Sequence, residues 1–130
     1  MRKIILPLLL CLISTSVFAE ILTFYTYETH RFNESATVFT AFEVHQTITF
    51  YGVEFVSIET NRHDSRIKSF TGKYTVLDLE NVYDEEKGSG VLFYLKKNND
   101  TYFMTIFDKF IVMGEEYGEG YLYVFHFMKR

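Results

Sequence analysis

The four histidines are the side chains best suited to metal binding or acid–base chemistry in this sequence. They are His30, His45, His63 and His126. No two of them stand at the spacing of a helical metal motif with a carboxylate nearby, so the sequence predicts no metal site and no cofactor. We expect His126 to lie at the edge of the core and to hydrogen-bond to the backbone.

The segment NRHDSR, residues 61–66, places Arg62, His63, Asp64 and Arg66 close together. Such a set could bind an anion or act as an acid–base pair. However, the chain offers no G-x-S-x-G motif, no cysteine nucleophile and no phosphate-binding glycine loop to accompany it. Because Asn and Asp favour turns, we expect a solvated hairpin loop. The sequence therefore favours a protein that is not an enzyme.

A second charged segment surrounds a turn and is acidic. Its members are Asp78, Glu80, Asp84, Glu85 and Glu86. Carboxylate oxygens suit calcium, but these residues lack the regular spacing of a calcium-binding loop. We expect them to be solvated charges that discourage pairing between sheet edges.

Residues 1–19 have the layout of a secretory signal peptide. Arg2 and Lys3 precede an apolar run, Ile4–Ile13, and small residues lead to Ala19. The run is too short to span a bilayer as a helix. We expect cleavage before Glu20, a single β domain over residues 20–130, and export to the periplasm or the extracellular space.

The composition of residues 20–130 narrows the choice of partners. Without Arg2 and Lys3, 11 basic residues stand against 17 acidic ones, a formal charge of −6. An acidic surface disfavours nucleic acid and anionic lipid. The only cysteine, Cys11, lies in the expected leader, so the exported domain has no disulfide and depends on packing alone.

The expected domain consists of β-branched and aromatic runs between short turn signals, which is typical of an all-β protein. The polar stretch 30–35 is expected to end the first run, and Gly52 is expected to mark a turn or a bulge. We predict one small antiparallel meander of about eight strands that closes as a β-barrel or a two-layer sandwich. The predicted strands cover residues 21–29, 37–50, 53–60, 68–80, 91–95, 101–107, 109–113 and 121–128.

The C-terminal strands have more apolar surface than one core face needs, and the last strand is apolar on both faces. We predict that its even face enters the core, because aliphatic side chains fill a narrow interior more readily than four aromatic rings. That face carries Leu122, Val124, His126 and Met128. The odd face would then point outward as a ligand- or partner-binding surface made of Tyr121, Tyr123, Phe125 and Phe127.

These patterns favour an exported, non-catalytic binding protein. Its aromatic face would be covered by a protein partner, by a second copy in a homodimer, or by a small apolar ligand. The alternative is a lipocalin-like carrier with its ligand inside the barrel. A small outer-membrane barrel comes third: EYGEGYLY, residues 116–123, resembles the end signal of such barrels, but the polar face with Glu43 and His45 disfavours membrane insertion.

Overall fold

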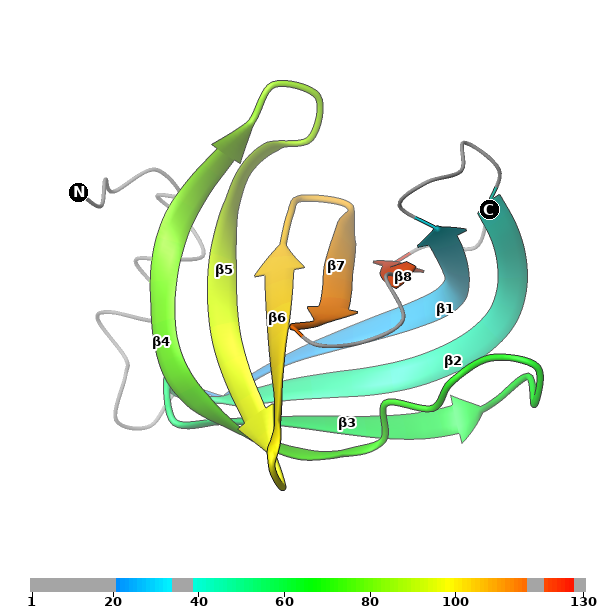
Figure 1. The fold of residues 1–130 in the computed structure, drawn as a ribbon, viewed down its shortest axis with the longest axis horizontal. Coiled ribbons are helices and arrows are strands. Elements are labelled where there is room, and N and C mark those ends of the chain that lie inside the picture. Colours follow the sequence, from blue (N-terminus) through cyan, green and yellow to red (C-terminus); the bar gives the residue numbers. More distant parts are fainter. Residues whose placement is uncertain (1–20, 34–38, 117–120, 128–130) are drawn as a thin grey trace.

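The structure is a computed structural model, and it describes residues 21–33, 39–116 and 121–127. Its strands are β1 (Ile21–Asn33), β2 (Phe39–Tyr51), β3 (Phe55–Arg62), β4 (Gly72–Asp84), β5 (Gly88–Lys97), β6 (Asp100–Ile106), β7 (Phe110–Glu115) and β8 (Tyr121–His126). Each strand pairs antiparallel with the next, and β8 returns to β1, so the sheet closes (Figure 1). The predicted all-β meander is confirmed, and it is a barrel. The predicted leader and its cleavage site lie outside the described residues.

Register shifts bend the long strands around the barrel. They lie after Thr26 in the β1–β2 pair, at Asn61 of β3 in the β2–β3 pair and after Val76 in the β4–β5 pair. An extra residue on one strand of a pair increases its local bend and twist, and Figure 1 shows β1, β2 and β4 as curved ribbons. The β2–β3 connection is a tight turn in which Gly52 has a φ of 60°, a conformation that favours glycine. Gly52 is therefore a turn residue.

The polar segment His30–Asn33 continues β1, so the predicted end of that strand is wrong. Within this segment Arg31 pairs with Thr40 of β2 on one side and with Tyr123 of β8 on the other. Two hydrogen-bonded neighbours stabilise an extended backbone whatever the polarity of the side chains, since strand preference depends on context. The segment consequently points the Arg31 side chain toward the barrel interior and the His30 side chain toward the outer face.

Alternate residues of the strands fill the interior with apolar side chains. The largest fully buried ones include Ile48, Phe50, Ile58, Tyr74, Phe93, Leu95, Met104, Ile111, Met113 and Phe125. Side chains from opposite walls meet: the ring centroids of Phe50 on β2 and Phe93 on β5 are 5.0 Å apart. The described interior is thus a packed core.

The β3–β4 connection, residues 63–71, closes part of one barrel end. Its side chains Ile67 and Phe70 are buried and belong to the core cluster. The ring of Phe70 lies 5.8 Å from that of Phe125, and its carbonyl oxygen accepts a hydrogen bond from the Tyr74 hydroxyl at 2.6 Å. Ile67 and Phe70 therefore anchor the connection, while residues 61–66, predicted as a solvated loop, are mostly exposed. Residues 68–71, predicted as the start of the fourth strand, belong to this connection. We call this end, where β1 and β7 end and β2 and β8 begin, the mouth.

Candidate functional site

The predicted orientation of the last strand is wrong. Tyr123 is 5% exposed and Phe125 is 0% exposed, and both belong to the core cluster. Tyr121 and Phe127 are partly buried and pack against that cluster. The aromatic rings fit because they interdigitate with aliphatic side chains of β7 and with Phe70 from the loop. A role of this face in binding a partner stays a prediction, but the face lines the interior and does not form an outer surface.

The predicted core face of β8 belongs to the outer wall. Leu122 and Val124 are half-buried there, opposite Gly114 and Val112 of β7. His126 is buried on the same side, and Met128 lies outside the described residues. The apolar outer surface that the sequence predicts for the C-terminal half is therefore present, and it is made of the aliphatic residues.

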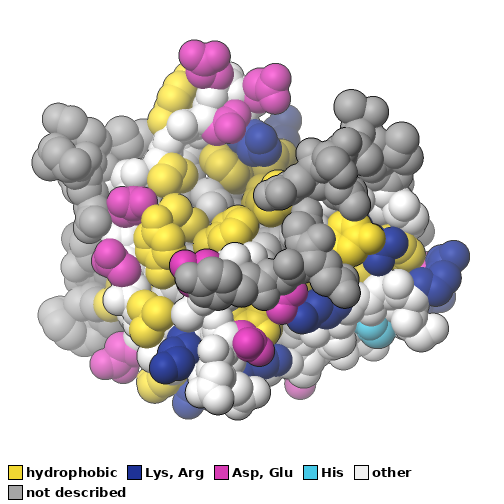
Figure 2. All heavy atoms as spheres, viewed as in Figure 1, with side chains coloured by type: hydrophobic (Ala, Val, Ile, Leu, Met, Phe, Trp, Pro, Cys, Tyr) yellow, Lys and Arg dark blue, Asp and Glu magenta, His cyan; other side chains and the backbone are white. Residues whose placement is uncertain are grey.

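The two halves of the outer wall differ in chemistry. On β2 and β3 the outward side chains are polar, including Glu43, His45, Thr47, Thr49, Ser57 and Glu59. On β5 to β8 they are mostly apolar, including Leu92, Tyr94, Phe103, Val112 and Val124. Figure 2 shows hydrophobic side chains gathered over β4–β6 with acidic side chains beside them. The apolar half is the surface on which a partner could bury area.

A groove of about 460 Å³ lies on this apolar half, across β4, β5 and β6. We call it the outer groove, and its lining includes Leu77, Leu92, Tyr94, Phe103 and Thr105. Leu77 alternates with the inward side chains of Tyr74 and Val76, so it points outward and is 54% exposed, and the register shift after Val76 turns Asp78 outward as well. On the far side, the ring of Phe103 occupies the space above Gly114, where a Cβ atom would come within 2.5 Å of the ring.

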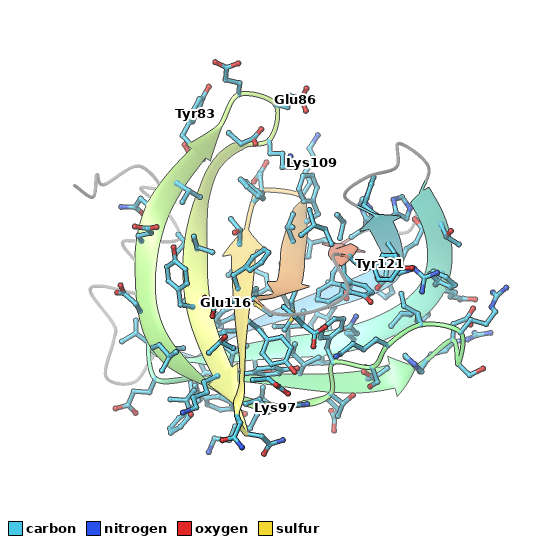
Figure 3. The ribbon with its side chains drawn as sticks, in the orientation of Figure 1. Tyr83, Glu86, Lys97, Lys109, Glu116 and Tyr121 are labelled. Carbon is cyan, nitrogen blue, oxygen red and sulfur yellow. The ribbon has the colours of Figure 1, made fainter. Side chains whose placement is uncertain are left out.

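Carboxylates border the outer groove. The Tyr94 hydroxyl donates to Glu80 at 3.0 Å, and the Thr101 hydroxyl donates to Glu116. Figure 3 shows Glu116 beside β6. A neighbouring cavity of about 210 Å³ is lined by Asn99, Asp100, Thr101, Glu115 and Glu116. Lys96 and Lys97 lie at that end of β5, opposite Thr101 and Asp100 of β6. The border of the groove is on balance acidic.

A chain of three polar side chains lies where β8 closes onto β1. His30 Nε2 is 3.2 Å from Glu28 Oε1, and His126 Nε2 is 3.1 Å from His30 Nδ1. Because a carboxylate only accepts, His30 donates to Glu28 through Nε2, and the tautomers of the two rings determine which of them donates in the His30–His126 contact. The sequence predicts the place of His126 at the core edge but not this partner, 96 positions away. The described part of the chain contains no group of three His, Cys, Asp or Glu placed to hold a metal ion.

Cations gather at the mouth. The Arg31 guanidinium lies 5.3 Å from the ring centroid of Phe42 and 4.8 Å from that of Tyr121, and the Arg66 guanidinium lies 5.4 Å from Phe42. Lys68 Nζ is 2.6 Å from Glu115 Oε2. Burial alone would lower the pKa of Lys68, but the hydrogen bond and charge of Glu115 outweigh it and raise that pKa.

The predicted polar loop, residues 61–66, makes two separate structural contacts. Arg66 donates to both carboxylate oxygens of Asp64, and these bonds hold the pKa of Asp64 well below its usual range. The Asp64–Arg66 pair shapes the turn, while His63 Nε2 bonds to the carbonyl of Ile67 at 2.8 Å. The residues weighed as an acid–base pair are thus divided between separate structural contacts, in agreement with the predicted loop.

Comparison of the chain with protein-family models, with curated proteins and with solved structures finds no match. The described residues contain no helix with the length and apolar character needed to cross a membrane. The site must accordingly be judged from its own geometry. Two places stand out in the described residues: the outer groove, for its shape and apolar lining, and the mouth, for its cations.

Proposed function

We propose that this chain is a non-catalytic binding protein that holds an apolar segment of a partner protein in the outer groove. The observation that carries the proposal is the groove itself, with Leu77 54% and Tyr94 38% exposed beside it. Its volume of about 460 Å³ falls in the range of ligand sites, and its lining combines apolar walls with a few polar tips. The predicted export of the protein remains a separate prediction.

The closed barrel determines how such a partner would bind. The strands under the groove, β5 and β6, are paired on both sides, so they offer no free edge for strand addition. The described ladders are incomplete elsewhere, because β8 pairs with β1 only over residues 28–33 and β3 pairs with β4 only over residues 72–75. A partner in the groove itself must therefore bind through side chains. Each apolar side chain buried in the groove contributes about 1.5–3 kcal/mol. Two such anchors contribute about 3–6 kcal/mol, which corresponds to a Kd of about 40 µM to 6 mM.

The acidic border selects the chemistry of that partner. Glu116 lines the groove, Glu80 accepts from Tyr94 on its wall and Asp100 lines the neighbouring cavity, while Lys96 and Lys97 lie at that end of β5. Complementary charge speeds association and discriminates between partners more than it adds affinity. We therefore expect a segment in which Leu or Phe side chains stand next to Lys or Arg.

The two alternatives from the sequence receive less support. A lipocalin-like carrier needs interior space, but Phe50 and Phe93 meet across the barrel and Phe70 packs onto Phe125. A membrane-spanning barrel has an apolar outer band all round and a polar interior. Here the interior is apolar, and the outer wall is polar on β2 and β3.

Peptide titration of residues 20–130 tests the proposal. A short peptide that alternates Leu with Lys should bind, and its Glu-containing counterpart should bind at least about tenfold more weakly. Leu77→Gln should weaken binding about tenfold, while Ile21→Gln, an equally exposed apolar residue at the start of β1, should leave it unchanged. Equal weakening by both variants, or no binding of either peptide, would contradict the proposal.

A second pair of variants tests the acidic border. Glu116→Gln removes one charge at the groove, and Glu59→Gln removes the same charge on the polar wall of β3. We expect only Glu116→Gln to reduce the association rate of the cationic peptide and the salt dependence of that rate. If the two variants behave alike, the groove binds apolar groups without selecting for charge.

A further inference from the structure

Arg31 lies at the mouth with its guanidinium between two aromatic rings. It points inward from the end of β1, where it pairs with Tyr123 of β8. The ring centroids of Phe42 and Tyr121 are 5.3 Å and 4.8 Å from its guanidinium carbon. Figure 3 shows Tyr121 at the start of β8, on the side of β1 and β2. The rings hold the planar group and leave its N–H edge for a further partner.

The charge balance at the mouth singles out Arg31 from its neighbours. Arg66 is paired with Asp64 and Lys68 with Glu115. Among the described residues, no carboxylate forms an ion pair with Arg31, although its side chain is half-buried. A partly buried charge without a counter-charge is costly to retain, and aromatic contacts offset only part of that cost.

We propose that the mouth is a second binding site, for an organic anion whose carboxylate or phosphate group receives the N–H edge of Arg31. The guanidinium fork matches both oxyanions and binds them in a bidentate manner. The rings of Phe42 and Tyr121 provide apolar walls for the body that carries the anion. This site is separate from the outer groove and takes ligands of the opposite charge.

The negative charge of the protein as a whole does not exclude such a ligand. At physiological ionic strength, charges on the exposed surface are screened beyond about 8 Å. The described ion pairs at the mouth engage Arg66 with Asp64 and Lys68 with Glu115. Arg31 is the cation that these pairs leave without a counter-charge among the described residues, and it decides binding at contact distance.

Titration of residues 20–130 with 1-naphthoate, followed by amide NMR, tests this inference. We expect shifts at Arg31, Phe42 and Tyr121, and about tenfold weaker binding by Arg31→Gln. Arg31→Lys keeps the charge but not the planar pair of N–H donors, so its affinity for 1-naphthoate should lie between those of the unmodified chain and of Arg31→Gln. Arg62→Gln, which removes an arginine paired with Glu43 on the outer wall, should bind as the unmodified chain does.

Further probes decide the class of ligand. 1-Naphthyl phosphate that binds more tightly than 1-naphthoate would assign a phosphate ligand, and the reverse order a carboxylate; inorganic phosphate should bind more weakly than either. If 1-naphthylmethylammonium binds as well as 1-naphthoate, or if Arg31→Gln has no effect, the inference is wrong. Shifts confined to β5 and β6 would also overturn it, while leaving the outer groove as the binding site.

Discussion

Replacement of Phe125 by alanine tests which face of β8 is buried. Phe125 is 0% exposed, packs against Phe70 at a centroid distance of 5.8 Å and lies opposite Ile111 of β7. Removing a fully buried phenyl ring costs about 3–5 kcal/mol through lost burial and the cavity that remains. Domains of this size are stable by about 5–15 kcal/mol, so Phe125→Ala should remove a fifth or more of the stability.

Val124→Ala is the matched control, because Val124 is the neighbouring residue on the outer face and is only half-buried. We expect it to cost about 1 kcal/mol or less. Urea unfolding, followed by far-UV circular dichroism and tyrosine fluorescence, measures the stability loss of both variants. In thermal unfolding, the melting temperature of Phe125→Ala should fall by about 15 °C. A larger loss from Val124→Ala than from Phe125→Ala would refute the orientation described here.

Two further predictions concern a buried hydroxyl and the outer wall. Burial, with smaller contributions from Tyr102 and Glu115, raises the pKa of Tyr74. The protonated Tyr74 hydroxyl therefore contributes its full share to the free energy of unfolding below the unfolded pKa of about 10, and this contribution is lost as the pH rises through the folded pKa. Tyr74→Phe should cost about 1–3 kcal/mol at neutral pH, because the Phe70 carbonyl loses its donor, and should flatten the alkaline loss in urea unfolding; an unchanged alkaline slope would argue against this. Gly114→Ala, whose Cβ would come 2.5 Å from the Phe103 ring, should displace that ring at a cost of about 1–3 kcal/mol and weaken peptide binding; normal binding would show that the ring does not shape the groove.

The sequence was sufficient to predict the strands but not the faces of the last one. β2 was predictable because Phe42, Val44, Ile48 and Phe50 alternate with polar residues, and all four are buried. β8 offers no such contrast, since both of its faces are apolar. Its orientation depends on the register with β1 and β7 and on Phe70 from the distant 63–71 loop, none of which is a local property.

The candidate sites depend even more on tertiary pairing. The excess of apolar surface in the C-terminal half was predictable from VLFYL, residues 91–95, and from the last strand. The outward position of Leu77 was also predictable, because it alternates with Tyr74 and Val76, but that of Asp78 was not, because it results from a register shift between β4 and β5. Arg31 belongs to a stretch that the sequence predicts as a strand break, and only the pairing of β1 with β8 brings it to Tyr121.

Paramagnetic relaxation from a spin-labelled Leu–Lys peptide tests the central claim most directly, because it locates the bound peptide on residues 20–130. If the peptide binds in the outer groove, the amide signals of Leu92, Phe103 and Thr105 are broadened at substoichiometric peptide. The signals of Thr47 and Ser57 on the polar wall then remain sharp. Broadening that is uniform, or that is strongest on β2 and β3, would contradict the claim that the outer groove is the binding surface.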